Sequence, residues 1–211
     1  MQQAMNELEA LRDPIAHLTG RYSVGARHLR EPAPGREDLL RMVEAALRAP
    51  DHAGLVPYRF AAVWGDDRAR LGDLFHSVAK AQGKPDAQAA IDRQRATDVP
   101  MLVAVIARID AGHPVATVHE QWIALGAALA NFLNAAHALG FGGKMLSGSK
   151  VRAERVMSAF CRPGETLVGW IVLGTPQGVG RPKFRKPEPA EVMGFWRGQP
   201  PNRPPGAPAP A

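Results

Sequence analysis

Cysteine is almost missing from this chain: among its 211 residues, Cys161 is the only one. A single thiol excludes an internal disulfide framework and any metal site built from several cysteines, and it fits a reducing compartment. Because no base partner is indicated near it in the sequence, we expect Cys161 to be an inert thiol that is buried or half-buried.

Long apolar runs are missing as well. The longest strongly apolar stretch, residues 101–107, is far too short to cross a bilayer. Asn6, Glu7 and Glu9 interrupt any apolar run near the start of the chain, so no signal peptide is indicated. We therefore expect a soluble, cytoplasmic protein that does not contact a membrane.

Several motifs that would indicate catalysis or nucleotide binding are incomplete. His113 and His119 are too far apart for a His-Glu-x-x-His metal site, and no metal is expected. The glycine-rich residues 140–143 follow a helical pattern, whereas the dinucleotide-binding fingerprint precedes a helix. Residues 143–150 nearly spell a phosphate-binding loop, but Ser149 stands where the lysine is required. A Gly-x-Ser-x-Gly nucleophile motif is also lacking.

The positive charge is unevenly distributed. The net charge is +6, and residues 177–211 contain six basic side chains against two acidic ones. These basic residues lie among prolines rather than among aromatic residues on a folded face, so we do not expect nucleic-acid binding. Residues 198–211 include six prolines, which predicts a disordered tail with polyproline character. The basic run before it is interpreted as a solvated tail or an anion-binding arm.

The stretch around which the rest is organised is residues 117–148. Thr117 and Glu120 have the spacing of a capping box, and no proline follows until after Leu139. Gly140 suits the left-handed position that ends many helices. The predicted helix, residues 118–139, is apolar on most sides, so we expect it to be a central core helix. Part of its surface is also a candidate subunit interface.

The remaining segments alternate without a regular order. Helices are predicted at residues 13–20, 36–49, 67–82 and 151–160. A further helix at 85–96 is very polar and is expected to be exposed. Strands are predicted at residues 57–64, 100–107, 144–146 and 166–173. About four strands and five or six helices in this order favour an α+β fold. We expect an N-terminal extension (1–12), one domain (13–197) and the tail (198–211).

Polar residues at three separate places are the candidates for a binding site. Arg21 and Ser23 follow the first helix, Arg48 and His52 flank a proline, and Ser147 follows the glycine-rich bend. Taken singly, each is explained by a surface ion pair, a turn or a helix end. From the residues alone, the sequence indicates an α+β domain with a possible anion site.

The combination of short segments resembles the flavin-dependent nitroreductase family, and in particular its compact NAD(P)H nitroreductase subgroup. The segments are Gly-Arg-Tyr-Ser (20–23), Glu-Pro-Ala-Pro (31–34), Arg-Ala-Pro-Asp-His (48–52), Pro-Tyr-Arg-Phe (57–60), Glu-Gln (120–121), Leu-Gly-Phe-Gly-Gly (139–143), Ser-Gly (147–148) and Val-Gly-Trp-Ile-Val-Leu-Gly-Thr-Pro (168–176). The resemblance covers roughly residues 14–177.

The resemblance implies a central mixed or antiparallel sheet flanked by helices, and a homodimer with FMN at the subunit interface. The family's Arg-Arg-Ser triplet reads Arg-Tyr-Ser here, and the loop after it is about two residues longer. The residues that the resemblance assigns to FMN are Arg21, Tyr22, Ser23, Arg48, His52, Met145, Leu146 and Ser147, with Arg185 as a further candidate on the C-terminal arm. Those assigned to the nicotinamide nucleotide are Ala135, Ala136, His137, Ala138, Leu139 and Gly140.

The activity implied by the resemblance is reduction of nitroaromatics, quinones or similar planar acceptors by NADH or NADPH. FMN itself carries the hydride on N5, so no catalytic side chain is expected. The changed residues at positions 22, 145 and 146 leave an alternative open: flavin storage or breakdown, or dehydrogenation of another metabolite. A second alternative is a non-enzymatic binding module that uses the basic arm.

Overall fold

The computed structural model describes residues 13–178 and 185–196. The chain divides into two compact units, Met1–Gly180 and Arg181–Ala211, which are described separately here. In the first unit the helices are α2 (Pro14–Gly20), α3 (Arg36–Ala46), α4 (Asp67–Ala81), α5 (Asp86–Thr97), α6 (Val118–Ala138) and α7 (Glu154–Phe160). The strands are β1 (Leu29–Arg30), β2 (Tyr58–Trp64), β3 (Met101–Ala107), β4 (Gly142–Leu146) and β5 (Thr166–Pro176). The second unit contains α8 (Pro189–Val192).

The five strands form one antiparallel sheet with β5 at its centre. One edge of β5 pairs with β3, which pairs in turn with β2. The other edge of β5 pairs with two strands in succession: residues 170–174 pair with β4, and residues 175–176 pair with β1. All seven residues of β3 are buried, as expected for a β-branched and apolar strand covered on both faces.

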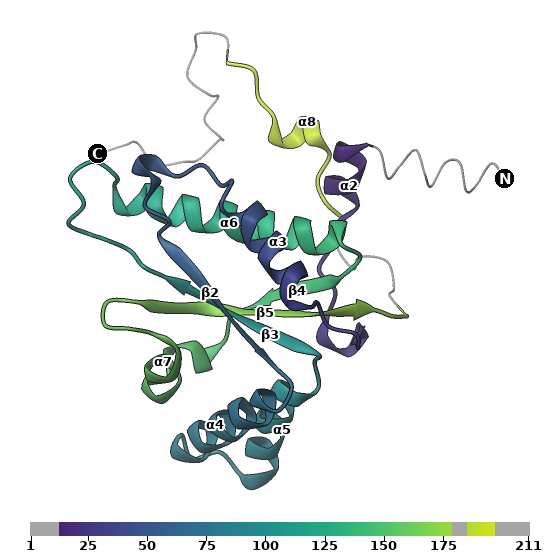
Figure 1. Cartoon of the computed structure of the whole chain (residues 1–211), viewed down its shortest axis with the longest axis vertical. Helices are drawn as coiled ribbons and strands as arrows, with labels where there is room; N and C mark the ends of the chain where they lie inside the picture. Colours follow the sequence, from purple (N-terminus) through teal and green to yellow (C-terminus); the bar gives the residue numbers. More distant parts are fainter. Residues whose placement is uncertain (1–12, 179–184, 197–211) are drawn as a thin grey trace, which may run out of the picture. The chain divides into compact units, whose positions relative to one another are not determined.

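Helices cover both faces of this sheet. Figure 1 shows α3 and α6 above the strands, and α4, α5 and α7 below them. Each face has its own apolar core. One contains Met42 of α3 and Phe132 of α6, and the other contains Phe75 of α4 and Val156 of α7. The α+β class predicted from the sequence is therefore confirmed.

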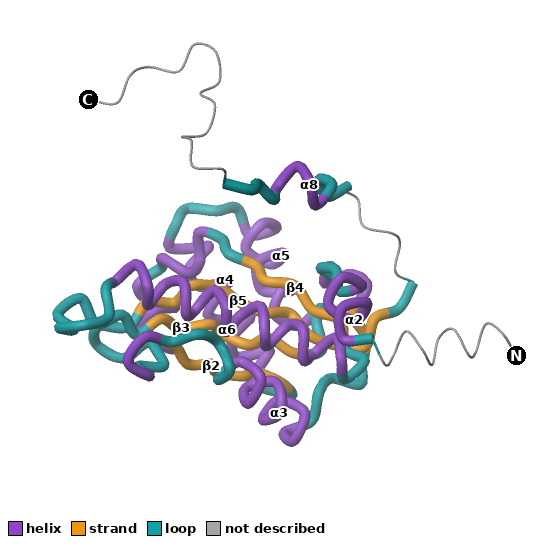
Figure 2. The backbone as a smooth tube through the Cα atoms, turned by 90° about the horizontal axis from the view of Figure 1, so that it is seen from above, coloured by secondary structure: helices purple, strands orange, loops and turns teal. Residues whose placement is uncertain are grey.

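The central helix α6 forms for the reasons given by its sequence. The Thr117 hydroxyl accepts a hydrogen bond from the Glu120 N–H at 3.3 Å, and the Glu120 carboxylate accepts one from the Thr117 N–H at 2.8 Å. The helix ends at Ala138, and Gly140, two residues later, has a φ of 85° in the left-handed region. Figure 2 shows α6 lying across the strands, with α2 beside one of its ends.

The structure differs from the sequence-based expectations in several elements. The helix predicted at 36–49 ends at Ala46, and the one predicted at 151–160 is divided into a 3₁₀ turn (Ser149–Arg152) and α7. The two-residue strand β1 and the four-residue helix α8 are too short to leave a periodic pattern. The polar helix α5 is exposed over most of its length, as expected, but it also packs against α4 and buries Ala89, Asp92 and Ala96.

Two further expectations concern residues that the structure does not describe. The N-terminal extension (1–12) and the tail (198–211) lie outside the described ranges, so the predicted domain boundaries stay predictions. Within the described ranges, no helix is both long enough and apolar enough to span a bilayer.

Candidate functional site

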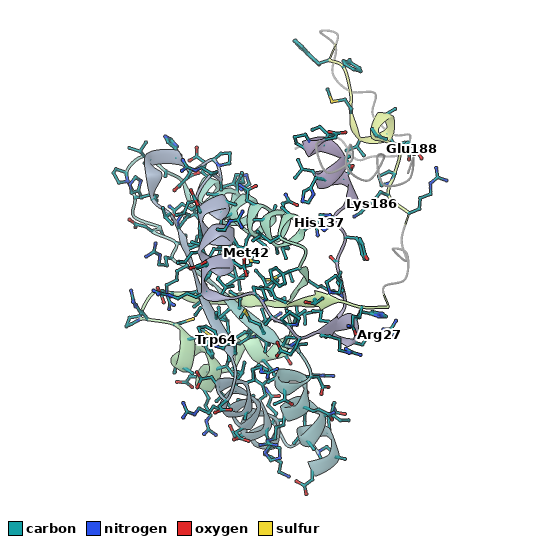
Figure 3. All side chains as sticks on the ribbon, turned by 45° about the vertical axis from the view of Figure 1, so that its right-hand side comes forward. Arg27, Met42, Trp64, His137, Lys186 and Glu188 are labelled. Carbon is teal, nitrogen blue, oxygen red and sulfur yellow. The ribbon has the colours of Figure 1, made fainter. Side chains whose placement is uncertain are left out.

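The first set of predicted residues surrounds a small cleft at the α2 end of α6. Arg21 and Tyr22 line this cleft together with His137 and the first residues of β4, and its volume is about 180 Å³. Ser23 is exposed beside them. We call Arg21, Tyr22 and Ser23 the Arg21 group. Figure 3 shows His137, at the end of α6, next to α2.

Two glycines of β4 allow the Arg21 group to lie against the sheet. The Val24 N–H donates to the Gly143 carbonyl at 3.0 Å, which holds the chain directly after Ser23 beside β4. A β-carbon at Gly142 would lie 3.0 Å from the Val24 side chain, and one at Gly143 would lie 2.8 Å from Leu173. Larger residues would push these segments apart, so the glycines are needed for the close approach.

The Arg21 guanidinium brings a positive charge to the edge of the cleft. The imidazoles of His17 and His137 stack with their centroids 4.5 Å apart, and Arg21 is close enough to influence the second ring. Burial lowers the pKa of His137, and the nearby His17 and Arg21 lower it further. Within the described residues, no carboxylate forms an ion pair with Arg21. A charge-assisted bond from the Arg21 guanidinium to an anion is therefore sterically and electrostatically available.

The second set of predicted residues lies at the other end of α6. His52 Nδ1 is 3.0 Å from Oε1 of Glu120, in the first turn of that helix. Hydrogen bonds from Thr117, together with the one from His52, hold the pKa of Glu120 at about 2, so this carboxylate is ionised at neutral pH. Arg48 is exposed four residues before His52. We call Arg48, His52 and Glu120 the His52 group.

The loop that carries His52 has an unusual backbone. Ala53 and Val56 both have positive φ, 65° and 47°, and a β-branched residue in this region is a genuine outlier. Asp51 holds this conformation by accepting a hydrogen bond from the Val56 N–H at 2.6 Å. Strain of this kind persists only where the surroundings enforce it, and it clusters at ligand-binding sites.

The third predicted stretch is the exposed end of β4. Met145 is partly buried, whereas Leu146 and Ser147 are exposed. Leu146 is paired with Trp170 of β5. A β-carbon at Gly169 would clash with the Leu146 carbonyl, so this glycine lets β4 lie close to β5 at that point. The end of β4 therefore presents an apolar side chain and a hydroxyl on a rigid support.

The Arg21 and His52 groups are separated by the length of α6. Glu120 and His137 are 17 positions apart, which corresponds to about 25 Å along a helix. One mononucleotide cannot reach both groups within a single protomer. The resemblance assigns these residues to a site shared by two subunits, and within one chain they lie at opposite ends of α6.

An apolar stripe connects the two groups along the outer face of α6. Trp122 and Ile123 are 41% and 55% exposed. Gly126 and Ala130 continue the exposed face at helical spacing, and Leu133 follows half-buried. Two large exposed apolar side chains followed by small residues on one helix face suit close contact with another chain.

The remaining predicted residues have varied positions. Of the nicotinamide stretch, His137 and Gly140 line the cleft, Ala136 is buried, and Ala135 and Leu139 are partly buried. Ala138 is exposed. Arg185 belongs to the second unit, where it forms an ion pair with Glu188 at 2.6 Å. Its assignment to FMN stays a prediction.

Sequence reasoning missed two residues at the site. His17 is stacked on His137, and no pattern predicted that α2 would lie beside the end of α6. Glu120 was assigned only to helix capping, although it also binds His52. The pair Glu120-Gln121 was part of the resemblance, and that signal could have identified it. The described residues contain no group of three or more potential metal ligands.

Comparison with known proteins shows the family of this chain. The profile of the Nitroreductase family matches residues 18–175, and this chain belongs to that family. A relative from Escherichia coli, named "Putative NAD(P)H nitroreductase YdjA", is 34% identical over 187 residues, which cover 87% of this chain and 100% of the relative.

Solved structures show the same fold. A nitroreductase-like family protein from Bacillus cereus superimposes with a TM-score of 0.74 at 22% identity, covering 88% of this chain and 97% of that one. A nitroreductase with bound FMN from Desulfitobacterium hafniense has a TM-score of 0.59 at 18% identity, covering 86% and 98% of the two chains.

Proposed function

We propose that this protein is a homodimeric, FMN-dependent oxidoreductase that uses NADH or NADPH to reduce nitroaromatics, quinones or similar planar acceptors. The observation that carries the proposal is the separation of the Arg21 and His52 groups by the length of α6. The family membership and the names of the relatives support the class of reaction.

Dimerisation resolves the separation of the two groups. In a two-fold interface the same surface of both protomers is in contact. If the apolar stripes of two α6 helices pack antiparallel, the Arg21 group of one protomer lies beside the His52 group of its partner. Two identical sites then form, one at each end of the helix pair. Burial of Trp122 and Ile123 supplies the apolar contact.

The residues present fit FMN. Its phosphate carries the negative charge that the Arg21 guanidinium can bind through charge-assisted hydrogen bonds, and Ser23 offers a hydroxyl donor. The close packing at Gly142 holds the segment that carries the Arg21 group against β4, so that this group borders the cleft. The exposed Leu146 provides an apolar contact for a planar ring, as ligand sites commonly do.

Tyr22 has a different task from the arginine that the family has at this place. Its side chain is partly buried and packs against the core around Val24 and Leu29. We infer that the ring holds the Arg21 segment in position, while the phosphate charge is met by Arg21 together with Arg48 of the partner subunit.

The reaction requires little acid or base chemistry from the protein. FMN held by Arg21 and Ser23 would supply the hydride transfer from the nicotinamide nucleotide to the acceptor. The side chains bind and orient the reactants, and the ionised Glu120 fixes His52 at the edge of the site. The nicotinamide nucleotide is proposed to contact residues 135–140, of which His137 and Gly140 border the cleft.

Purification gives the first test. The proposal predicts a yellow protein that releases FMN on denaturation and oxidises NADH or NADPH with a nitroaromatic or a quinone as acceptor. A colourless protein that cannot be reconstituted with FMN would refute it. A yellow dimer without steady turnover of either acceptor class would instead favour flavin storage or another dehydrogenation.

A further inference from the structure

Asp92 is a buried carboxylate in a helix that otherwise looks exposed from its sequence. Its side chain has no solvent exposure. A buried charge is strongly unfavourable unless it is paired and hydrogen-bonded. Asp92 has three cationic partners: Lys84 at 2.8 Å, Arg95 at 2.7 Å and Lys150 at 2.8 Å.

The three cations come from different parts of the chain. Lys84 precedes α5, and Arg95 lies one turn further along α5. Lys150 instead belongs to the turn after β4, three residues beyond Ser147. Its side chain is 14% exposed, against 30% for Lys84 and 60% for Arg95. The Lys150 pair is therefore the best shielded from solvent and the least screened by salt.

Lys150 also contacts an aromatic side chain that packs against the sheet. Its ammonium lies 5.3 Å from the centroid of the Phe75 ring, within the range of a cation–π interaction. Phe75 packs edge-on against Trp170, with 5.8 Å between the ring centroids. Trp170 is the residue of β5 that pairs with Leu146. Lys150 is thus held by groups on both α4 and α5, directly beneath the end of β4.

The segment between Leu146 and Lys150 has few anchors of its own. Ser147, Gly148 and Ser149 are all exposed. Within the described residues, neither serine side chain forms a hydrogen bond, and the backbone contributes a bond from the Val151 N–H to the Gly148 carbonyl at 3.1 Å. The course of this loop is therefore determined by Leu146 on one side and by Lys150 on the other.

We propose that Asp92 is a positioning residue for flavin binding. It acts through Lys150, which fixes the loop of residues 147–149 in the conformation that meets FMN. This inference rests on the proposed function, because it assigns to the loop the role of a flavin contact. Asp92 itself does not touch the cofactor. In this proposal, helices α4 and α5 support the flavin site through their contacts with Lys150.

The three partners of one carboxylate provide matched variants. Lys150→Met removes the cation on the loop, whereas Lys84→Met and Arg95→Met remove cations that have no connection to it. Each variant leaves Asp92 with two partners, so the folded chain is retained. Lys150→Arg keeps the charge and serves as the conservative rescue. Asp92→Asn removes the shared carboxylate.

Flavin affinity and thermal stability are to be measured on each variant, with FMN removed and then titrated by fluorescence. We expect Lys150→Met and Asp92→Asn to raise the Kd for FMN about tenfold, which equals about 1.4 kcal/mol. Lys84→Met and Arg95→Met should lower Tm no more than Lys150→Met does, because their cations are more exposed, and should change the Kd less than about twofold. Lys150→Arg should restore the affinity.

The possible results separate the inference from the proposed function. Unchanged FMN affinity in Lys150→Met would overturn the inference alone. So would a Kd that rises in all three cation variants in proportion to the loss of Tm, because the network would then have only a general structural role. Failure of the wild-type protein to bind FMN would overturn the proposed function, and the inference with it.

Discussion

Replacement of Ile123 by arginine should separate the dimer and, with it, release the flavin. Ile123 is 55% exposed on the outer face of α6. Complete burial of an isoleucine side chain contributes about 1.5–3 kcal/mol, so covering this exposed half contributes about 1–1.5 kcal/mol per protomer. Because the interface is two-fold symmetric, Ile123 of each protomer is covered, and the two copies together contribute about 2–3 kcal/mol to the interface.

The arginine adds a second penalty. A guanidinium without a partner in an apolar contact loses hydration that nothing replaces, and two copies face one another near the axis. The combined loss is at least about 4 kcal/mol, or roughly three orders of magnitude in the dimer Kd. Light scattering after size-exclusion chromatography over a range of protein concentrations measures this change, and the absorbance of bound FMN is recorded in the same run.

Ile91 provides the matched control. It is 48% exposed on α5, on the opposite face of the sheet, so Ile91→Arg should leave both the dimer and the flavin content unchanged. A dimer of Ile123→Arg that retains its full FMN would refute the assignment of the α6 stripe to the interface. Equal loss in both variants would show that the effect is unspecific.

Three further predictions follow from single side chains. Arg21→Ala should weaken FMN binding by about 1.5–3 kcal/mol, the range for a hydrogen bond to a charged group; unchanged affinity would exclude it as the phosphate ligand. Arg59 and the Arg162 N–H hold the pKa of Glu165 at about 2, so its contribution to stability is complete above pH 4.5 and is lost as the pH falls towards 2. Glu165→Gln should lower the free energy of unfolding by about 2–3 kcal/mol at pH 7 and make it less dependent on pH in that range, as urea titrations can test. Burial raises the pKa of the Cys161 thiol, so alkylating reagents at pH 7 should leave activity intact; rapid inactivation that FMN does not prevent would contradict this.

Much of the fold follows from local sequence patterns. The helix α6 was predicted closely because its capping residues, its lack of proline and Gly140 act within a few residues of one another. The strand β3 was predicted because seven consecutive apolar residues suit a strand buried on both faces. The first helix begins as expected, with the Asp13 carboxylate accepting a hydrogen bond from the Ile15 N–H at 2.8 Å.

The site could be predicted only in part. The candidate residues were assigned from the resemblance, but their division between the two ends of α6 depends on the packing of α2 and α3 against that helix. The burial of one side of α5 against α4 could not be predicted from the sequence of that helix either. Asp92 looks like a surface residue in its own segment, and its partner Lys150 lies 58 positions further along the chain. The stacking of His17 on His137 could not be predicted either, because these two residues are also far apart in the chain.

Mixing two inactive variants tests the two-protomer site most directly. Arg21→Ala and Arg48→Ala each damage both sites of a homodimer. A heterodimer of the two variants has one site with both arginines and one site with neither, so random exchange of subunits should restore FMN to about one quarter of all sites. The account predicts this recovery, with FMN found in the heterodimer fraction. If the mixture binds no more FMN than the separate variants, each site is built from a single protomer and the account is contradicted.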